Sequence, residues 1–284
     1  MKYRENVRVL SCNRIGTDIF SLRLQTEHIA AAAKPGQFVS VYANDSARLL
    51  PRPISVCEAD GESGVLRLVF RIAGEGTREF SKFQEGDRVD ITGPLGNGFP
   101  LEAAKGKKVF LIGGGIGIPP MLELAKRLTE TGENREERCE KNCKERSGES
   151  REGNFKASCK AILGYRDEIF LREDFPCETV IATEDGSAGT KGNVLDAIRE
   201  HHLEADVIFA CGPTPMLRAL KQYAQEHGIE CWLSMEEKMA CGIGACLSCV
   251  CRSTGIDEHS QVKNKRVCTE GPVFRSTEIE VYLR

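Results

Sequence analysis

Four cysteines near the carboxy-terminal end of the sequence have the spacing most clearly suited to chemistry. Cys241, Cys246 and Cys249 follow one another at C-x4-C-x2-C spacing, and Cys268 comes later in the chain. Three thiolates from one tight loop and a fourth from a returning segment can hold a [2Fe-2S] cluster. Glycines inside the loop let the backbone turn and let its N–H groups approach the sulfurs. The spacing therefore predicts an iron–sulfur centre.

Other assignments of the cysteines stay open. Structural zinc is the main competitor, although zinc ribbons usually present two C-x2-C pairs and this segment has one. Cys251 could replace a ligand, because it lies two residues beyond Cys249 and an extended chain directs both to one face. Cys139 and Cys143 lack two further ligands nearby, so we expect them to be exposed bystanders. The other cysteines are expected to be small buried hydrophobic residues; they are Cys12, Cys57, Cys159, Cys177 and Cys231.

A glycine-rich segment, residues 113–121, follows an apolar stretch and precedes a helical pattern. A strand, a glycine turn and a helix start together form an anion-binding arrangement, because glycines admit a phosphate and the helix start offers free N–H groups. Proline suits the first helical turn. At the first crossover of an α/β sheet such a loop predicts a nucleotide site. Cys211-Gly212-Pro213 also follows an apolar strand, although Cys211 is equally well explained as a core thiol.

The amino-terminal half contains two weaker candidates. In Arg52-Pro53-Ile54-Ser55 the guanidinium could pair with a phosphate while the hydroxyl reaches a polar ring edge. Gly74-Glu75-Gly76-Thr77 precedes an amphipathic helical turn, so Thr77 could cap a helix directed at a pyrophosphate. Capping without any ligand explains the second segment equally well.

The elements that must position these residues show two patterns. Before residue 100, short alternating stretches with Gly and Pro turns predict an antiparallel barrel or sandwich. From about residue 107, apolar runs alternate with helical segments, which predicts a parallel sheet wound with helices. The expected fold is thus a β-barrel plus an α/β domain. We divide the chain into residues 1–100, residues 101–228 with a charged insertion at 133–154, and a cysteine-rich part at 229–284.

Length and charge limit the function. The 284 residues suffice for two cores, and the net charge of −3 disfavours nucleic acid as a partner. The first residues lack a signal-peptide pattern and no apolar run is long enough to cross a bilayer, so we expect a cytoplasmic protein without a membrane partner. A reducing cytosol disfavours disulfides as the explanation for 13 cysteines.

Taken in order, these segments resemble the ferredoxin-reductase superfamily, which has an FAD-binding β-barrel followed by a nicotinamide-binding α/β domain. Residues 234–249 and 267–274 are similar to the electron-transfer subunits of NAD-dependent (type B) dihydroorotate dehydrogenases. The resemblance covers nearly the whole chain. It departs from the family's compact form at the insertion of residues 133–154 and in the long stretch between Cys249 and Cys268.

The resemblance implies a role for each candidate residue. Ser55 would lie near the reactive edge of the flavin, Arg52 on a phosphate, and Cys211 near the nicotinamide. The implied FAD-binding residues are Arg52, Pro53, Ile54, Ser55, Val69, Phe70, Arg71, Gly76 and Thr77. The implied NAD-binding residues are Gly115, Gly117, Pro120, Cys211, Gly212 and Pro213, and the implied cluster ligands are Cys241, Cys246, Cys249 and Cys268.

The implied activity is electron transfer in pyrimidine biosynthesis. A separate FMN-containing dihydroorotate dehydrogenase catalytic subunit, in a heterotetramer of two plus two, would oxidise dihydroorotate and pass electrons through the [2Fe-2S] cluster and FAD to NAD+. No side chain of this chain is expected to be catalytic. One alternative is the small subunit of an NADPH-dependent ferredoxin oxidoreductase or a hydrogenase-linked flavin complex, and Arg166 and Asp167 leave both NAD and NADP open. An alternative of another class is a zinc-stabilised interaction protein with purely structural glycine loops.

Overall fold

The computed structural model describes residues 1–45, 47–129, 157–256 and 261–282. The charged insertion predicted at 133–154, with Cys139 and Cys143, lies outside the described residues.

Six strands form a closed antiparallel barrel in the order β1-β2-β5-β4-β3-β6. The pairing of β1 with β6 closes it, and buried and exposed side chains alternate along its strands, as in β1, where Val7 and Val9 are buried on either side of the exposed Arg8. The prediction of an antiparallel barrel or sandwich is confirmed in its barrel form. The strands are β1 (Tyr3–Gly16), β2 (Ile19–Gln25), β3 (Phe38–Val41), β4 (Arg52–Asp60), β5 (Val65–Arg71) and β6 (Arg88–Leu95), and two short helices, α1 (Ile29–Ala32) and α2 (Glu75–Phe80), accompany them.

A second sheet has seven strands in the order β10-β9-β8-β7-β11-β12-β15. Its neighbours pair in parallel except β15, which is antiparallel to β12. The predicted parallel sheet is therefore confirmed. Its strands are β7 (Lys108–Gly114), β8 (Ser158–Tyr165), β9 (Glu178–Thr183), β10 (Thr190–Lys191), β11 (Val207–Cys211), β12 (Glu230–Ser234) and β15 (Val273–Arg275).

Helices cover both faces of this sheet, as its apolar strands require. Val109 and Leu111 of β7 pack in one cluster with helix α3, whereas Phe110 and Ile112 pack in another with α5 and α6. The long helices are α3 (Ile118–Thr129), α5 (Val194–Glu200) and α6 (Thr214–His227), and the short 3-10 segments are η1 (Leu101–Ala104), η2 (Gly115–Gly117) and η3 (Arg172–Asp174).

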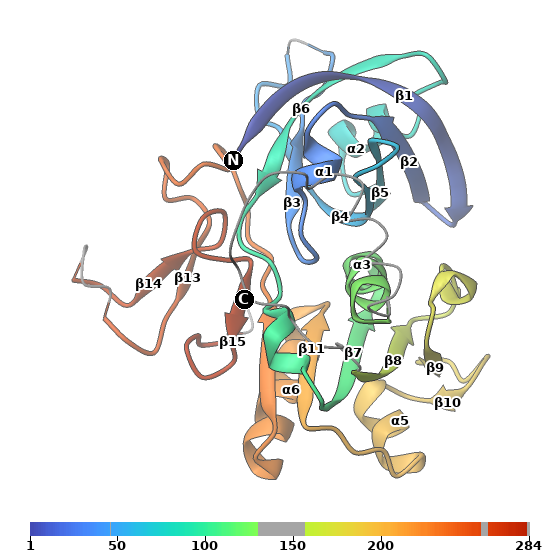
Figure 1. The fold of residues 1–284 in the computed structure, drawn as a ribbon, viewed down its shortest axis with the longest axis vertical. Helices are drawn as coiled ribbons and strands as arrows, with labels where there is room; N and C mark the ends of the chain where they lie inside the picture. Colours follow the sequence, from blue (N-terminus) through green and yellow to red (C-terminus); the bar gives the residue numbers. More distant parts are fainter. Residues whose placement is uncertain (46, 130–156, 257–260, 283–284) are drawn as a thin grey trace, which may run out of the picture.

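Helix α3 lies between the barrel and the sheet (Figure 1). The backbone N–H of Ala59 in β4 donates a 3.0 Å hydrogen bond to the carboxylate of Glu123, which is buried in α3. Glu58 forms ion pairs with both Arg67 of the barrel and Lys126 of α3. These contacts hold the barrel on the sheet.

The residues after 228 contribute more to the sheet than the sequence suggests. β12 and β15 are both strands of the seven-stranded sheet, and the cysteine loop lies between them in the sequence. β13 (Val250–Arg252) and β14 (Asn264–Arg266) form a separate antiparallel pair that projects to one side of the molecule (Figure 1). The three-part division at residues 100 and 228 stays a prediction.

Candidate functional site

The four predicted ligand cysteines lie together as two pairs. The backbone N–H of Cys246 donates to Cys241 Sγ at 3.4 Å, and that of Cys268 donates to Cys249 Sγ at 3.4 Å. The thiols of each pair are also within hydrogen-bonding reach of each other, and the Cys268 thiol is close enough to Cys241 to respond to its charge. Folding therefore brings a thiol of the returning segment to the three thiols of the loop.

The loop owes its shape to residues in the left-handed backbone region. Gly242, Gly244 and Leu247 have φ values of 67°, 88° and 57°. A Cβ atom on Gly242 would lie 3.0 Å from Ser40 Oγ, so the loop rests against strand β3 of the barrel. A Cβ on Gly244 would lie 2.8 Å from Thr269 Cγ2, next to Cys268. Glycine at both positions thus allows a turn and a close approach.

The loop backbone favours negatively charged sulfur. Burial raises the pKa of Cys241, but the backbone N–H groups of Ile243, Cys246 and Ala245 outweigh it and lower the pKa to about 6. Burial followed by the contact with the Cys249 thiol raises the pKa of Cys268 to about 12. A bound metal deprotonates such a thiol. The donor set therefore fits a centre that takes four thiolates.

The four cysteine thiols are arranged in pairs rather than as one compact group. In the described part of the chain, no three His, Cys, Asp or Glu side chains are grouped so as to hold one metal ion. The cysteine thiols instead form the two pairs described above, which would give each iron of a [2Fe-2S] cluster two thiolates.

Cys251 faces different neighbours. It lies in β13 opposite Lys265 of β14 and is 5% exposed. Burial, followed by the charges of Glu237 and Glu270, raises its pKa to about 11. Acidic and basic side chains therefore act on the charge of this thiol.

The residues predicted to bind FAD lie on neighbouring elements of the barrel. Arg52-Pro53-Ile54-Ser55 begins β4, whose neighbour β5 ends with Val69-Phe70-Arg71. Gly76, in the first turn of α2, packs against the Arg52 side chain, because a Cβ there would lie 2.8 Å from Arg52 Nε. Arg52 Nη1 donates to the Leu50 carbonyl at 2.7 Å. The Arg52 guanidinium and the glycine turn at the start of α2 therefore lie against each other.

Thr77 acts from inside helix α2 rather than from its N-cap. The N-cap residue is Gly74, and Thr77 is the third helical residue. The Thr77 hydroxyl accepts hydrogen bonds from the N–H groups of Ala73 at 2.9 Å and Gly74 at 3.2 Å, and donates to the Gly74 carbonyl at 3.0 Å. It therefore fixes the turn that presents Gly76.

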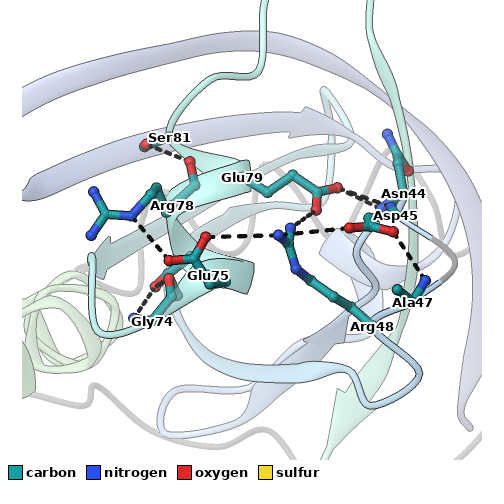
Figure 2. A network of polar contacts seen from close by, with 10 residues as sticks. Asn44, Asp45, Ala47, Arg48, Gly74, Glu75, Arg78, Glu79 and Ser81 are labelled. Atoms are coloured by element: carbon teal, nitrogen blue, oxygen red, sulfur yellow. Dashed lines mark hydrogen bonds and ion pairs between the residues drawn. The ribbon is translucent and has the colours of Figure 1, made fainter.

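A network that the sequence analysis missed holds the β3–β4 loop on helix α2. Figure 2 shows Arg48 among Glu79, Glu75 and Asp45, with ion pairs of 3.7 Å to Glu75 and 3.6 Å to Asp45. The Asn44 N–H also donates to Glu79 at 2.6 Å. The i, i+4 spacing of Glu75 and Glu79 on one helix face was the available signal. The network steadies the loop that leads into Arg52.

The two predicted nucleotide loops touch at the carboxyl ends of β7 and β11. A Cβ on Gly117 would lie 2.3 Å from the carbonyl oxygen of Cys211, and one on Gly114 would lie 2.6 Å from Met216 Sδ. Gly115 has a φ of 53°. Pro120 lies in the first turn of α3 and is buried. Ligands of open parallel sheets bind at such strand ends.

Cys211 is neutral at the end of β11. Burial raises its pKa to about 12, against the lowering effect of a hydrogen bond with Ser234, and the Glu236 carboxylate adds to the rise. It is thus a thiol beside the glycine turn. Arg166 and Asp167 are both exposed just beyond β8.

Comparisons with known proteins agree with this geometry. The family described as the oxidoreductase FAD-binding domain matches residues 7–99, and the iron-sulfur cluster binding domain of dihydroorotate dehydrogenase B matches residues 236–280. The chain is 41% identical over 282 residues to the dihydroorotate dehydrogenase B (NAD(+)) electron transfer subunit of Bacillus caldolyticus, covering 97% of this chain and 98% of the relative. The corresponding subunit of Bacillus velezensis is 40% identical over the same shares of both chains.

Solved structures share the fold over most or nearly all of the chain. A chain of an NADH-dependent reduced ferredoxin–NADP oxidoreductase has a TM-score of 0.79 and 28% identity, covering 97% of this chain and 90% of that one. A ferredoxin reductase of carbazole 1,9a-dioxygenase, with a TM-score of 0.58 and 19% identity over 80% of this chain and 67% of that one, shares the fold. Within the described residues, no helix has the length and apolar character needed to span a membrane.

Proposed function

This chain belongs to the family of dihydroorotate dehydrogenase B electron transfer subunits, and from that membership we propose that it carries electrons from an FMN-containing catalytic subunit, through a [2Fe-2S] cluster and FAD, to NAD+. Dihydroorotate oxidation takes place on the partner subunit. The chain is thus the electron-transfer part of an oxidoreductase in pyrimidine biosynthesis.

One observation carries this proposal. The position of a Cβ on Gly242, inside the cysteine loop, is 3.0 Å from Ser40 Oγ, and Ser40 pairs across β3–β4 with Pro53 of the Arg52–Ser55 segment. Neighbouring strands lie about 4.8 Å apart. The cysteine loop and the flavin segment are therefore separated by one strand, β3, which suits the passage of single electrons between their cofactors.

Each group of residues has a distinct task. Cys241, Cys246, Cys249 and Cys268 hold the cluster, and Arg52 offers its guanidinium to a flavin phosphate. Gly115 leaves room for a nucleotide phosphate at the start of α3, Gly117 lets the Cys211 turn pack closely against this loop, and the neutral Cys211 thiol adds no charge beside the nicotinamide. When bound, the cluster supplies one-electron chemistry and the flavin exchanges electrons with the nicotinamide as hydride.

The rim of the cysteine loop suits a protein partner. Ile243 and Leu247 are 54% and 59% exposed, and Cys246 is exposed between them in the sequence. Exposed apolar side chains grouped in this way mark interaction sites. We assign this rim to the catalytic subunit in a heterotetramer of two plus two. We also place the complex in the cytoplasm, where reducing conditions keep the ligand thiols available.

The test is the activity of the complex. The chain is co-expressed with the FMN-containing catalytic subunit of its own organism, and dihydroorotate-dependent reduction of NAD+ is measured beside diaphorase activity with NADH and NADPH. The proposal expects co-purification, NADH formation and a strong preference for NADH. Failure of the two chains to associate, together with a strong preference for NADPH, would contradict it and favour a ferredoxin oxidoreductase.

A further inference from the structure

One buried polar atom near the cysteine loop has no partner. In the described part of the chain, Thr269 Oγ1 is the buried side-chain oxygen or nitrogen that makes no hydrogen bond. Burying a hydroxyl without a partner is costly, and such groups commonly point to a ligand that satisfies them. The hydroxyl therefore needs an acceptor that the protein itself does not supply.

The position of Thr269 identifies the class of that acceptor. The residue follows Cys268 directly, and its Oγ1 is 3.3 Å from where a Cβ on Gly244 would stand. The Gly244 backbone also forms a hydrogen bond with the Cys268 sulfur. Thr269 is thus in contact with the same turn that directs an N–H group at a ligand thiol. Sulfurs of a centre held by the four cysteines are the acceptors that this position suits.

The backbone around Thr269 is well fixed. Its own N–H donates to the Arg266 carbonyl at 3.2 Å, and the Glu270 carboxylate accepts from the Arg266 backbone N–H and side-chain Nε, each at 2.9 Å. The backbone from which the Thr269 side chain extends is therefore held in place. This pre-organisation suits a donor that acts on a bound group.

We propose that the Thr269 hydroxyl donates a hydrogen bond to a sulfur of the bound [2Fe-2S] cluster and thereby raises the reduction potential of that cluster. The inference rests on the proposed function, since it requires the cluster. Reduction adds one negative charge to the cluster, so a hydrogen-bond donor stabilises the reduced form more than the oxidised form. Thr269 would then favour the arrival of an electron from the catalytic subunit.

The test is a redox titration of the complete chain, purified anaerobically with its cluster and followed by EPR. Thr269→Val keeps the shape of the side chain and removes the hydroxyl. We expect it to lower the equilibrium constant for cluster reduction about tenfold, which is about 59 mV for one electron. Thr269→Ser keeps the hydroxyl and is expected to stay close to the potential of the unchanged protein.

The reduction potentials of the Thr269 variants decide whether the hydroxyl acts on the cluster. An unchanged potential in Thr269→Val, or an equal shift in Thr269→Ser, would overturn it, because a packing effect does not distinguish hydroxyl from methyl in this way. If Thr269→Val fails to hold the cluster, Thr269→Ala takes its place under the same criterion. If Thr269→Val and Thr269→Ala both lose the cluster while Thr269→Ser retains it, the hydroxyl is needed to hold the cluster and the inference stands. If Thr269→Ser also loses the cluster, the inference is overturned. Absence of a cluster in the unchanged protein is a failure of the proposed function, and it is seen before any variant is made.

Discussion

At the scale of single residues, the cysteines that we propose as cluster ligands differ from Cys251 in the groups that surround their thiols. Cys249 and Cys251 are almost equally buried, at 2% and 5% exposure. The Cys249 sulfur accepts the N–H of Cys268, whereas Cys251 lies among Glu237, Glu270 and Lys265. The sequence spacing alone allowed either cysteine to be a cluster ligand, because an extended chain directs alternate residues to one face. The two cysteines differ in the residues that folding brings to them from other segments, and we base the proposed ligand set on that difference.

Substitution of these two cysteines tests that distinction. Cys249→Ser is expected to lose most of the bound iron, and Cys251→Ser, matched in burial, to retain about two irons per chain. Iron and acid-labile sulfide analysis with visible absorption measures both. Equal iron loss in the two variants would contradict the ligand set.

A second pair of variants tests whether Arg52, which packs against Gly76, binds a phosphate of FAD. Gly76→Ala places a Cβ 2.8 Å from Arg52 Nε, so the arginine must move, and we expect FAD affinity to fall about tenfold or more as a charge-assisted contact is lost. Gly74→Ala is the control, because nothing lies within 4 Å of its Cβ and its φ of 178° suits alanine. Titration with FAD after removal of the flavin gives both affinities. A similar affinity in the two variants would argue against Arg52 as a phosphate ligand.

At the scale of elements, helix α3 joins the barrel to the sheet through charged groups at its surface. Burial opposes ionisation of Glu58, but hydrogen bonds and charge from Lys126 and Arg67 outweigh it and lower the pKa of this carboxyl. Arg67 also pairs with Asp174 of η3 at 2.7 Å. Glu58 thus joins the barrel to helix α3, and Arg67 extends this contact to η3 through Asp174.

The sign of the resulting pH dependence follows from linkage. A carboxyl whose folded pKa is lower than its unfolded value of about 4.3 stabilises the fold above that value and loses its contribution as pH falls through the folded pKa. Glu58→Gln is therefore expected to cost about 1–3 kcal/mol at pH 7, with a cost that shrinks below about pH 4. Thermal unfolding from pH 7 to pH 3 measures it.

Glu204→Gln is the matched control for that experiment. The Glu204 side chain is 83% exposed, and its ion pair with Lys108 spans 3.6 Å. Exposed pairs contribute little to stability, so its unfolding curves should follow those of the unchanged protein. A loss of stability in Glu58→Gln that stays constant across the pH range would contradict the assigned role.

Most elements could be predicted from their patterns, and the exceptions have physical reasons. The alternation around Val7 and the apolar run from Val207 to Cys211 reflect local burial, so they were visible in the sequence. β15 has three residues and is held by pairing with β12, a long-range contact that leaves no periodic signal. The Arg48 network was missed for the same reason, since it joins a loop to a helix. The cysteine and glycine motifs could be recognised in the sequence because their chemistry requires those residue types.

At the scale of the whole molecule, Asn97 links the end of the barrel to the segment that carries Cys268. Its backbone N–H donates to the Gly271 carbonyl at 2.6 Å. Its side chain donates to the carbonyls of Glu270 at 3.0 Å and Val273 at 2.7 Å, and accepts the Val273 N–H at 3.0 Å. One amide therefore sets the position of the cluster segment against the barrel.

Loss of that amide should slow electron transfer inside the chain. In Asn97→Ala we expect reduction of the cluster by NADH, followed by stopped-flow absorbance, to slow about tenfold, because small misplacements of reacting groups cost rate. Flavin reduction itself should keep its rate. Asn44→Ala is the control, since the side-chain amide of Asn44 donates inside the barrel, to the Arg88 carbonyl at 3.3 Å. Parallel slowing of flavin and cluster reduction would contradict this role.

The proposed function requires that this chain hold a di-iron cluster in electronic contact with FAD and NAD. The most direct measurement is low-temperature EPR of the anaerobically purified chain before and after addition of NADH. We predict no cluster signal in the oxidised protein and the signal of a reduced [2Fe-2S] centre after NADH, in about the amount obtained with dithionite. A chain that contains zinc, or that gives no such signal even with dithionite, would contradict the account.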